Sequence, residues 1–186
     1  MQNIAIFASG NGTNAENICT YFFSSNSFQV VLICSNNKKA LVLKKAKNLN
    51  IKSFLFTKQD LESSFLVEEA LKNLAVDIIV LAGFLLKVPN RIISLYKDKI
   101  INIHPSLLPK YGGKGMYGIN VHREVVKNGE KESGITVHLV NEVYDNGRVV
   151  FQKSIPVSEN DTPETLFSKV QKLEYLYYPK IIESSF

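Results

Sequence analysis

Apolar residues in the first half of the chain gather in short runs, and stretches with helical spacing separate these runs. The runs predict four strands, over residues 4–8, 30–34, 51–56 and 76–81. The spacing between them predicts a helix that starts near Ala15 and two more over 40–48 and 61–74. Because strands alternate with helices, we expect right-handed βαβ crossovers and a doubly wound α/β sheet.

The second half has a different pattern. A strand over 100–103 is followed by a proline- and glycine-rich loop, and two alternating runs, 135–140 and 149–155, predict antiparallel strands. The last helix is predicted to have Asp161 as N-cap, Pro163 at its first position and Glu164 as the acid of a capping box. Pro179 is expected to end or kink this helix.

Composition is that of one globular domain. The chain has 186 residues, of which 45% are hydrophobic and 21% charged. No apolar run reaches the roughly 18 residues that a transmembrane helix needs, and the N-terminus lacks the basic stretch of a signal peptide. We therefore expect a single domain, 1–186, located in the cytoplasm.

The net charge of +5 favours anionic partners. Only three of the 22 basic residues are arginines, and no basic run is interleaved with aromatic residues, so a small anionic substrate is a better interpretation than nucleic acid. Cys19 and Cys34 have no metal-ligand spacing and are expected in the core, and the three histidines lack matched acids or thiols. No metal site is predicted.

The first candidate site is the segment Gly10-Asn11-Gly12-Thr13-Asn14, between a strand and a helix. Glycines allow an anion to approach the backbone, and the N-terminus of a helix favours phosphate. The alternative is a tight turn in which Thr13 or Asn14 caps the helix. A third glycine, an acid after the second strand and a Walker lysine are all missing, so a phosphate monoester fits better than a nucleotide cofactor.

The second candidate site is Asn102 with His104. Two residues apart on a strand, they point to one face, and an amide and a protonated imidazole can both donate to an oxyanion. A structural role for His104 remains equally open. Asp145 is read as a turn residue or as a partner of the imidazole, His122 as a surface or loop-packing residue, and His138 as a satisfied strand residue.

These segments, in this order, resemble the folate-dependent phosphoribosylglycinamide formyltransferase family from Ile4 to about Pro179. The most specific parts are segments 10–14, 81–84, 102–111 and 134–138, followed by Asp145-x-Gly147. The resemblance implies a mostly parallel mixed sheet with a Rossmann-like N-terminal half. Residues 1–100 would be the phosphate-binding half and 101–186 the catalytic and folate-binding half.

The resemblance also implies a role for each matched residue. The catalytic residues would be Asn102, His104 and Asp145. Phosphoribosylglycinamide would contact Gly10, Asn11, Gly12, Thr13, Asn14, Gln171 and Glu174. The folate pocket would be lined by Leu85, Leu86, Lys87, Val88, Asn102, Asn141, Glu142, Val143, Tyr144 and Asp145.

The implied reaction is transfer of the formyl group of the co-substrate 10-formyltetrahydrofolate to the amine of phosphoribosylglycinamide, in purine biosynthesis. Protonated His104 and Asn102 would stabilise the oxyanion, and Asp145 would raise the pKa of His104. The implied partners are the two small substrates, without metal, nucleic acid or membrane, in a monomer or homodimer. Two alternatives stay open: a hydrolytic formyltetrahydrofolate deformylase, and a phosphate- or RNA-binding module without catalysis.

Overall fold

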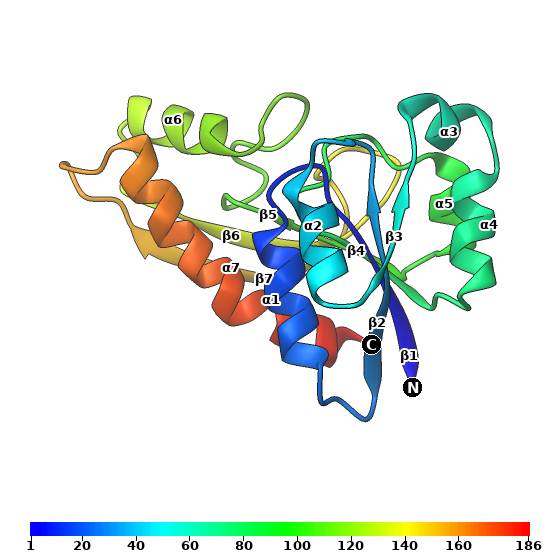
Figure 1. Cartoon of the computed structure of the whole chain (residues 1–186). Coiled ribbons are helices and arrows are strands. Elements are labelled where there is room, and N and C mark those ends of the chain that lie inside the picture. Colours follow the sequence, from blue (N-terminus) through cyan, green and yellow to red (C-terminus); the bar gives the residue numbers. More distant parts are fainter. The chain divides into compact units, whose positions relative to one another are not determined.

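A computed structural model describes all 186 residues of the chain. The chain divides into two compact units, Met1–Ile101 and Asn102–Phe186. The strand order is β3-β2-β1-β4-β5-β6-β7, and strands and helices follow one another along the chain (Figure 1). The predicted fold class, an α/β protein with a mostly parallel mixed sheet, is confirmed.

The first unit alternates strands and helices. Its elements are β1 (Gln2–Phe7), α1 (Thr13–Phe22), β2 (Phe28–Ser35), α2 (Leu41–Asn48), β3 (Lys52–Leu55), α3 (Lys58–Ser63), α4 (Leu66–Asn73), β4 (Ile78–Leu81) and α5 (Asn90–Leu95). Strand β1 pairs in parallel with β2 and β4, and β2 pairs in parallel with β3. From β1 the sheet grows first towards β2 and β3 and then, on the other side, towards β4. Because such crossovers are right-handed, the helices that belong to these two directions cover opposite faces of the sheet. In Figure 1, α1 and α2 lie on one face and α4 and α5 on the other.

The core of this unit is built on its two central strands. All four residues of β4 are buried, and in β1 the run from Ile4 to Phe7 is inaccessible to solvent. Two of their four register pairs, Ile4 opposite Ile78 and Ile6 opposite Val80, consist of β-branched residues. Strand β4, which lies within the predicted run 76–81, is therefore buried on both faces.

The second unit carries an antiparallel pair and a long helix. Its elements are β5 (Ile100–His104), which begins at the boundary, α6 (Ile119–Lys127), β6 (Glu132–Leu139), β7 (Val149–Pro156) and α7 (Pro163–Ser185). Strands β6 and β7 are antiparallel, with Ile135 opposite Lys153 and a shift of register between Val137 and His138. Helix α7 contacts both strands and α6 (Figure 1).

The single helix predicted over 61–74 is instead two helices, α3 and α4, because the chain turns at Ser64. The backbone there is extended, and the Ser64 hydroxyl donates to Asp60 O and accepts from Leu66 N. Arg91 binds the carbonyls that the end of α3 leaves without partners, those of Leu61, Glu62 and Ser64. A residue about 30 positions away thus stabilises the break, and local spacing could not reveal it.

Helix α7 differs from its prediction in its N-cap, and it does not end at Pro179. Its N-cap is Thr162, which forms a capping box with Thr165, so the predicted Asp161 cap and Glu164 partner are wrong. The helix also continues past Pro179 to Ser185. Tyr178, Pro179 and Ile182 are all buried, and we infer that their packing offsets the hydrogen bond that proline cannot make.

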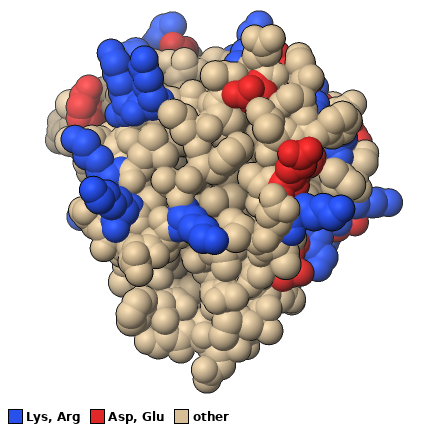
Figure 2. Space-filling model, turned by 45° about the vertical axis from the view of Figure 1, so that its right-hand side comes forward, with Lys and Arg blue, Asp and Glu red and all other residues tan.

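Positive charge is dispersed on the surface. On the face in Figure 2, Lys and Arg side chains form several separate groups with wide uncharged areas between them. None of the helices has the length and apolar character required to cross a membrane.

Candidate active site

Three polar side chains of the second unit face one another at the ends of strands. His104 closes β5, His138 lies near the end of β6, and Asp145 lies in the turn before β7. Asp145 is 3.6 Å from Nδ1 of His104 through Oδ2 and 3.7 Å from Nε2 of His138 through Oδ1. Both rings are buried, with 4% and 2% of their surface exposed. The structure therefore brings the predicted pair His104 and Asp145 together.

Asn102 joins this cluster through His138. Its amide Nδ2 donates to Nε2 of His138 over 3.1 Å. Since Nε2 accepts, Nδ1 carries the proton that is donated to the Leu139 carbonyl over 3.0 Å. The second proton of the Asn102 amide remains available for another acceptor.

His104 is held on its other side by the backbone. Its Nε2 donates to the Tyr111 carbonyl over 2.7 Å, while Nδ1 faces the Asp145 carboxylate. Both ring nitrogens therefore face acceptors, an arrangement that suits a doubly protonated ring.

Burial nevertheless lowers the pKa of His104 below its ordinary value, and the Asp145 charge and the Tyr111 carbonyl, which both raise it, do not compensate. The prediction that Asp145 raises the pKa of His104 is correct for the Asp145 contribution, but burial outweighs it and the net pKa is lowered.

The turn that carries Asp145 is fixed by close backbone contacts. Asp145 has a left-handed φ of 52°, and its Oδ2 accepts from Gly113 N over 2.8 Å. A Cβ at Gly147 would lie 1.6 Å from the Leu139 carbonyl oxygen, which explains the glycine two residues after Asp145. Asp145 is thus both a turn residue and a partner of the imidazoles.

Asp145 stays ionised in this environment. Burial opposes its charge, but the neighbouring His138, the His104 ring and the Gly113 N–H together outweigh burial and hold the pKa of the carboxyl below its ordinary value. The cluster therefore holds one partly buried negative charge beside two buried imidazoles.

The loop that follows His104 is anchored by one buried threonine. The Thr136 hydroxyl donates to the Ser106 carbonyl over 2.7 Å and accepts from Leu108 N over 2.9 Å. Gln152 on β7 donates to both the Leu108 carbonyl and the Thr136 hydroxyl. Strands β6 and β7 thereby fix the path of the chain from His104 to Tyr111.

In the first unit, the predicted phosphate loop leads directly into α1. The N-cap of α1 is Gly12, in the left-handed region with φ of 67°, and no side chain caps the helix. The alternative that Thr13 or Asn14 is the N-cap is therefore wrong. A Cβ at Gly12 would lie 2.3 Å from Cγ2 of Val42, so only glycine lets the chain pass this close to α2.

The segment 83–88 lies beside this loop. The Ser9 hydroxyl donates to Oδ1 of Asn36 over 2.6 Å and accepts from Leu85 N over 3.0 Å. Within the predicted folate segment, Leu85 and Lys87 are exposed and Val88 is buried.

The other predicted ligand contacts lie in the second unit. Segment 141–144 is partly or fully exposed, and Asn141 folds it by donating to the Asn146 carbonyl. Gln171 and Glu174 are half-buried, one turn apart on α7.

Sequence reasoning missed three members of the cluster. His138 was assigned only a structural role, although its place at the end of a strand, shared with His104, was a signal for it. Tyr111 takes part through its backbone carbonyl, which no side-chain pattern reveals. Gly113 likewise contributes only its N–H.

The expectation that His122 is a surface residue is wrong. This residue is 1% exposed on α6, and its ring lies 5.5 Å from that of Phe167. Burial, and then the charge of His104, lowers the pKa of His122 to about 4.

Two smaller expectations can be compared with the structure. Cys19 and Cys34 are buried free thiols, as predicted. No group of three or more His, Cys, Asp or Glu side chains is arranged to hold a metal ion.

A strand-end cluster of this kind on a doubly wound sheet is typical of an enzyme site. The chain belongs to the formyl transferase family, whose model matches residues 2–182. It is 37% identical to the phosphoribosylglycinamide formyltransferase of Bacillus subtilis, over 98% of this chain and 94% of that protein. It is also 37% identical to the chloroplastic phosphoribosylglycinamide formyltransferase of Arabidopsis thaliana, of which it covers 64%.

Solved structures agree with these relatives. The phosphoribosylglycinamide formyltransferase of Anaplasma phagocytophilum superimposes with a TM-score of 0.89 at 32% identity, over 98% of this chain and 85% of that one. The glycinamide ribonucleotide transformylase 1 of Geobacillus kaustophilus also gives 0.89, at 33% identity, over 99% and 98%.

Proposed function

We propose that this chain transfers the formyl group of 10-formyltetrahydrofolate to the amine of phosphoribosylglycinamide. Membership of the formyl transferase family and the names of the relatives support this reaction. The observation that carries it to named residues is the cluster in which Asp145 faces both His104 and His138. Such a cluster provides donors for an oxyanion and a group that can take up a proton.

The amine attacks the formyl carbon directly, and the carbonyl oxygen becomes an oxyanion. The amide proton of Asn102 that His138 does not use is its first donor. His104 is neutral at rest because burial lowers its pKa, so it can accept the proton that the attacking nitrogen must lose. The imidazolium that forms is stabilised by Asp145 and stabilises the oxyanion in turn.

The intermediate then collapses. The bond from the formyl carbon to folate N10 breaks, and N10 takes the proton from the imidazolium. His104 returns to its neutral state, so protons and charge balance over one turnover.

The phosphate of phosphoribosylglycinamide binds, in this proposal, to Gly10, Asn11, Gly12, Thr13 and Asn14. Helix α1 has no side-chain cap at its N-terminus, and the N–H groups and dipole of its first turn favour a phosphate. Gln171 and Glu174 of α7 contact the rest of this substrate.

The folate binds segments 85–88 and 141–145. Leu85, Val143 and Tyr144 are exposed apolar side chains, which suits contact with a flat aromatic ring system. The backbone groups of both segments supply polar contacts to the pterin. The two substrates of the proposed reaction are these small molecules, and we place the reaction in the cytoplasm.

The test follows tetrahydrofolate release from 10-formyltetrahydrofolate, with and without phosphoribosylglycinamide. Release that depends on the amine supports transfer. Release without the amine would show a hydrolase instead, and no release in either case would favour a module that binds phosphate without catalysis.

A further inference from the structure

Tyr111 connects the His104 ring to a second cluster of polar groups. Its carbonyl accepts from Nε2 of His104 over 2.7 Å. Its own hydroxyl donates to Glu130 Oε1 over 2.9 Å and accepts from Asn128 Nδ2 over 3.0 Å. The two ends of one residue thus hold the imidazole and the segment between α6 and β6.

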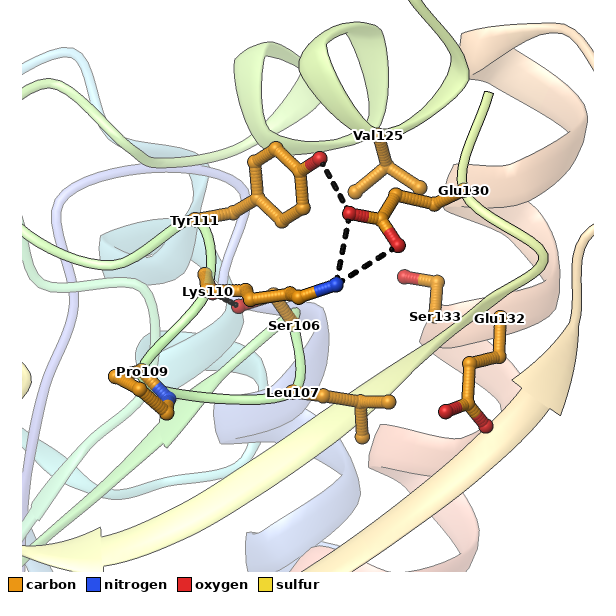
Figure 3. Close-up of a pocket in the computed structure, with 9 residues that line it drawn as sticks. All are labelled: Ser106, Leu107, Pro109, Lys110, Tyr111, Val125, Glu130, Glu132 and Ser133. Atoms are coloured by element: carbon orange, nitrogen blue, oxygen red, sulfur yellow. Dashed lines mark hydrogen bonds and ion pairs between the residues drawn. The ribbon is translucent and has the colours of Figure 1, made fainter. Parts of the chain in front are cut away.

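The acceptor of the Tyr111 hydroxyl is itself fixed. Lys110 Nζ lies 3.0 and 3.1 Å from the two Glu130 oxygens, as Figure 3 shows. The hydrogen bond from Lys110, and then that from Tyr111, holds the pKa of Glu130 below its ordinary value. Glu130 is therefore an ionised acceptor at neutral pH, and hydrogen bonds to ionised groups are the stronger kind.

Packing alone does not fix the Tyr111 ring. One side of it borders a cavity of about 250 Å³, also lined by Val125, Ser133 and Glu132 (Figure 3). The Ser133 hydroxyl, buried at the wall of this cavity, has no hydrogen-bond partner. A ring with open space on one side is restrained mainly by the bonds of its hydroxyl.

The Tyr111 backbone also needs this restraint. Its φ of 57° lies in the left-handed region, which costs energy for a residue with a side chain. The carbonyl that accepts from His104 depends on this conformation, and the next residues form the hydrogen bond from Gly113 to Asp145.

We propose that Tyr111 is a positioning residue for His104: its hydroxyl, held by Glu130 and Asn128, fixes the backbone carbonyl that orients the imidazole. The proposal rests on the proposed function only for its effect on turnover. The orientation of the His104 ring in the free protein does not depend on the proposed function.

Two measurements test this proposal. Tyr111→Phe removes the hydroxyl and keeps the ring, and we expect kcat to fall about tenfold while KM for both substrates stays within about twofold. The imidazole resonances of the free protein, followed by NMR against pH, should show His104 titrating at lower pH in the variant, because the Tyr111 carbonyl raises its pKa. The chain has only three histidines, which makes this spectrum simple.

The groups that face or influence His104 in this unit are Asp145, His138 and His122. None of them is changed in the variant. Tyr117→Phe, the same substitution at a half-exposed position of the same loop, is the matched control and should keep the wild-type kcat and titration.

A second pair of variants covers the case in which Tyr111→Phe fails to fold. Glu130→Ala removes the acceptor and should reproduce the loss, whereas Glu130→Gln retains an acceptor and should restore most of it. The proposal is overturned if Tyr111→Phe or Glu130→Ala leaves the His104 titration unchanged, whether or not kcat falls. An inactive wild-type protein would instead refute the proposed function, and the titration would still test the positioning.

Discussion

At the scale of the residue, the account depends on the balance of charge around His104. Burial and the Asp145 carboxylate act on its pKa in opposite directions, and burial has the larger effect. A ring that is neutral in the free protein can accept a proton during the reaction, and the positive charge that it then carries stabilises the oxyanion.

The first prediction concerns His104→Ala. We expect kcat to fall by roughly 100- to 1000-fold, the usual effect of losing one oxyanion donor, and KM for both substrates to change little. Steady-state kinetics with each substrate varied in turn would measure this. Near-normal turnover in a folded variant would exclude the assigned role.

A buried histidine outside the cluster gives a prediction on stability. His122 has a pKa of about 4 against an ordinary value of 6.5, and its Nδ1 is buried without a partner. The unfolded chain therefore takes up this proton first as the pH falls, so stability is lost between about 6.5 and about 4.

Replacing this group should remove that loss. The free energy of unfolding of His122→Leu and of the wild type is measured in urea at pH 7.5 and 5. The value of the variant minus that of the wild type should be larger at pH 5 than at pH 7.5. His104 has a lowered pKa as well, but it is present in both proteins and cancels in the comparison. An equal difference at both pH values would count against the assigned pKa.

At the scale of the element, adding one methyl group at Gly12 tests whether the turn from β1 into α1 requires glycine. Gly12→Ala places a Cβ 2.3 Å from Cγ2 of Val42, in a left-handed conformation, and should lower the free energy of unfolding by about 1–3 kcal/mol. Gly10→Ala is the control, because its Cβ would meet no atom within 4 Å. Equal stability of the two variants would contradict this account of the turn.

The elements also show where sequence reasoning stops. Apolar runs located every strand. In the inner strands the run reflects burial on the sheet, whereas β3 and β7 are mostly exposed. The break between α3 and α4 depends on Arg91, and the continuation of α7 past Pro179 depends on buried neighbours. Short helix α5 was not predicted at all. The first two errors arise where tertiary contacts override the local pattern.

At the scale of the whole molecule, a similar division holds for the candidate site. Residue types and spacing located Asn102, His104 and Asp145, and the structure brings them into one cluster of the second unit. Two parts of the site escaped prediction. Tyr111 and Gly113 act through backbone groups, and the pKa of His104 is lowered by burial. Neither leaves a mark in a single sequence.

The central claim is transfer of the formyl group to an amine, and an isotope label tests it most directly. The protein is mixed with 10-formyltetrahydrofolate labelled in the formyl carbon and with phosphoribosylglycinamide, and the products are identified by mass spectrometry. The account predicts that the label appears in the formylated amine of the ribonucleotide. Label recovered as free formate, with the ribonucleotide unchanged, would contradict it.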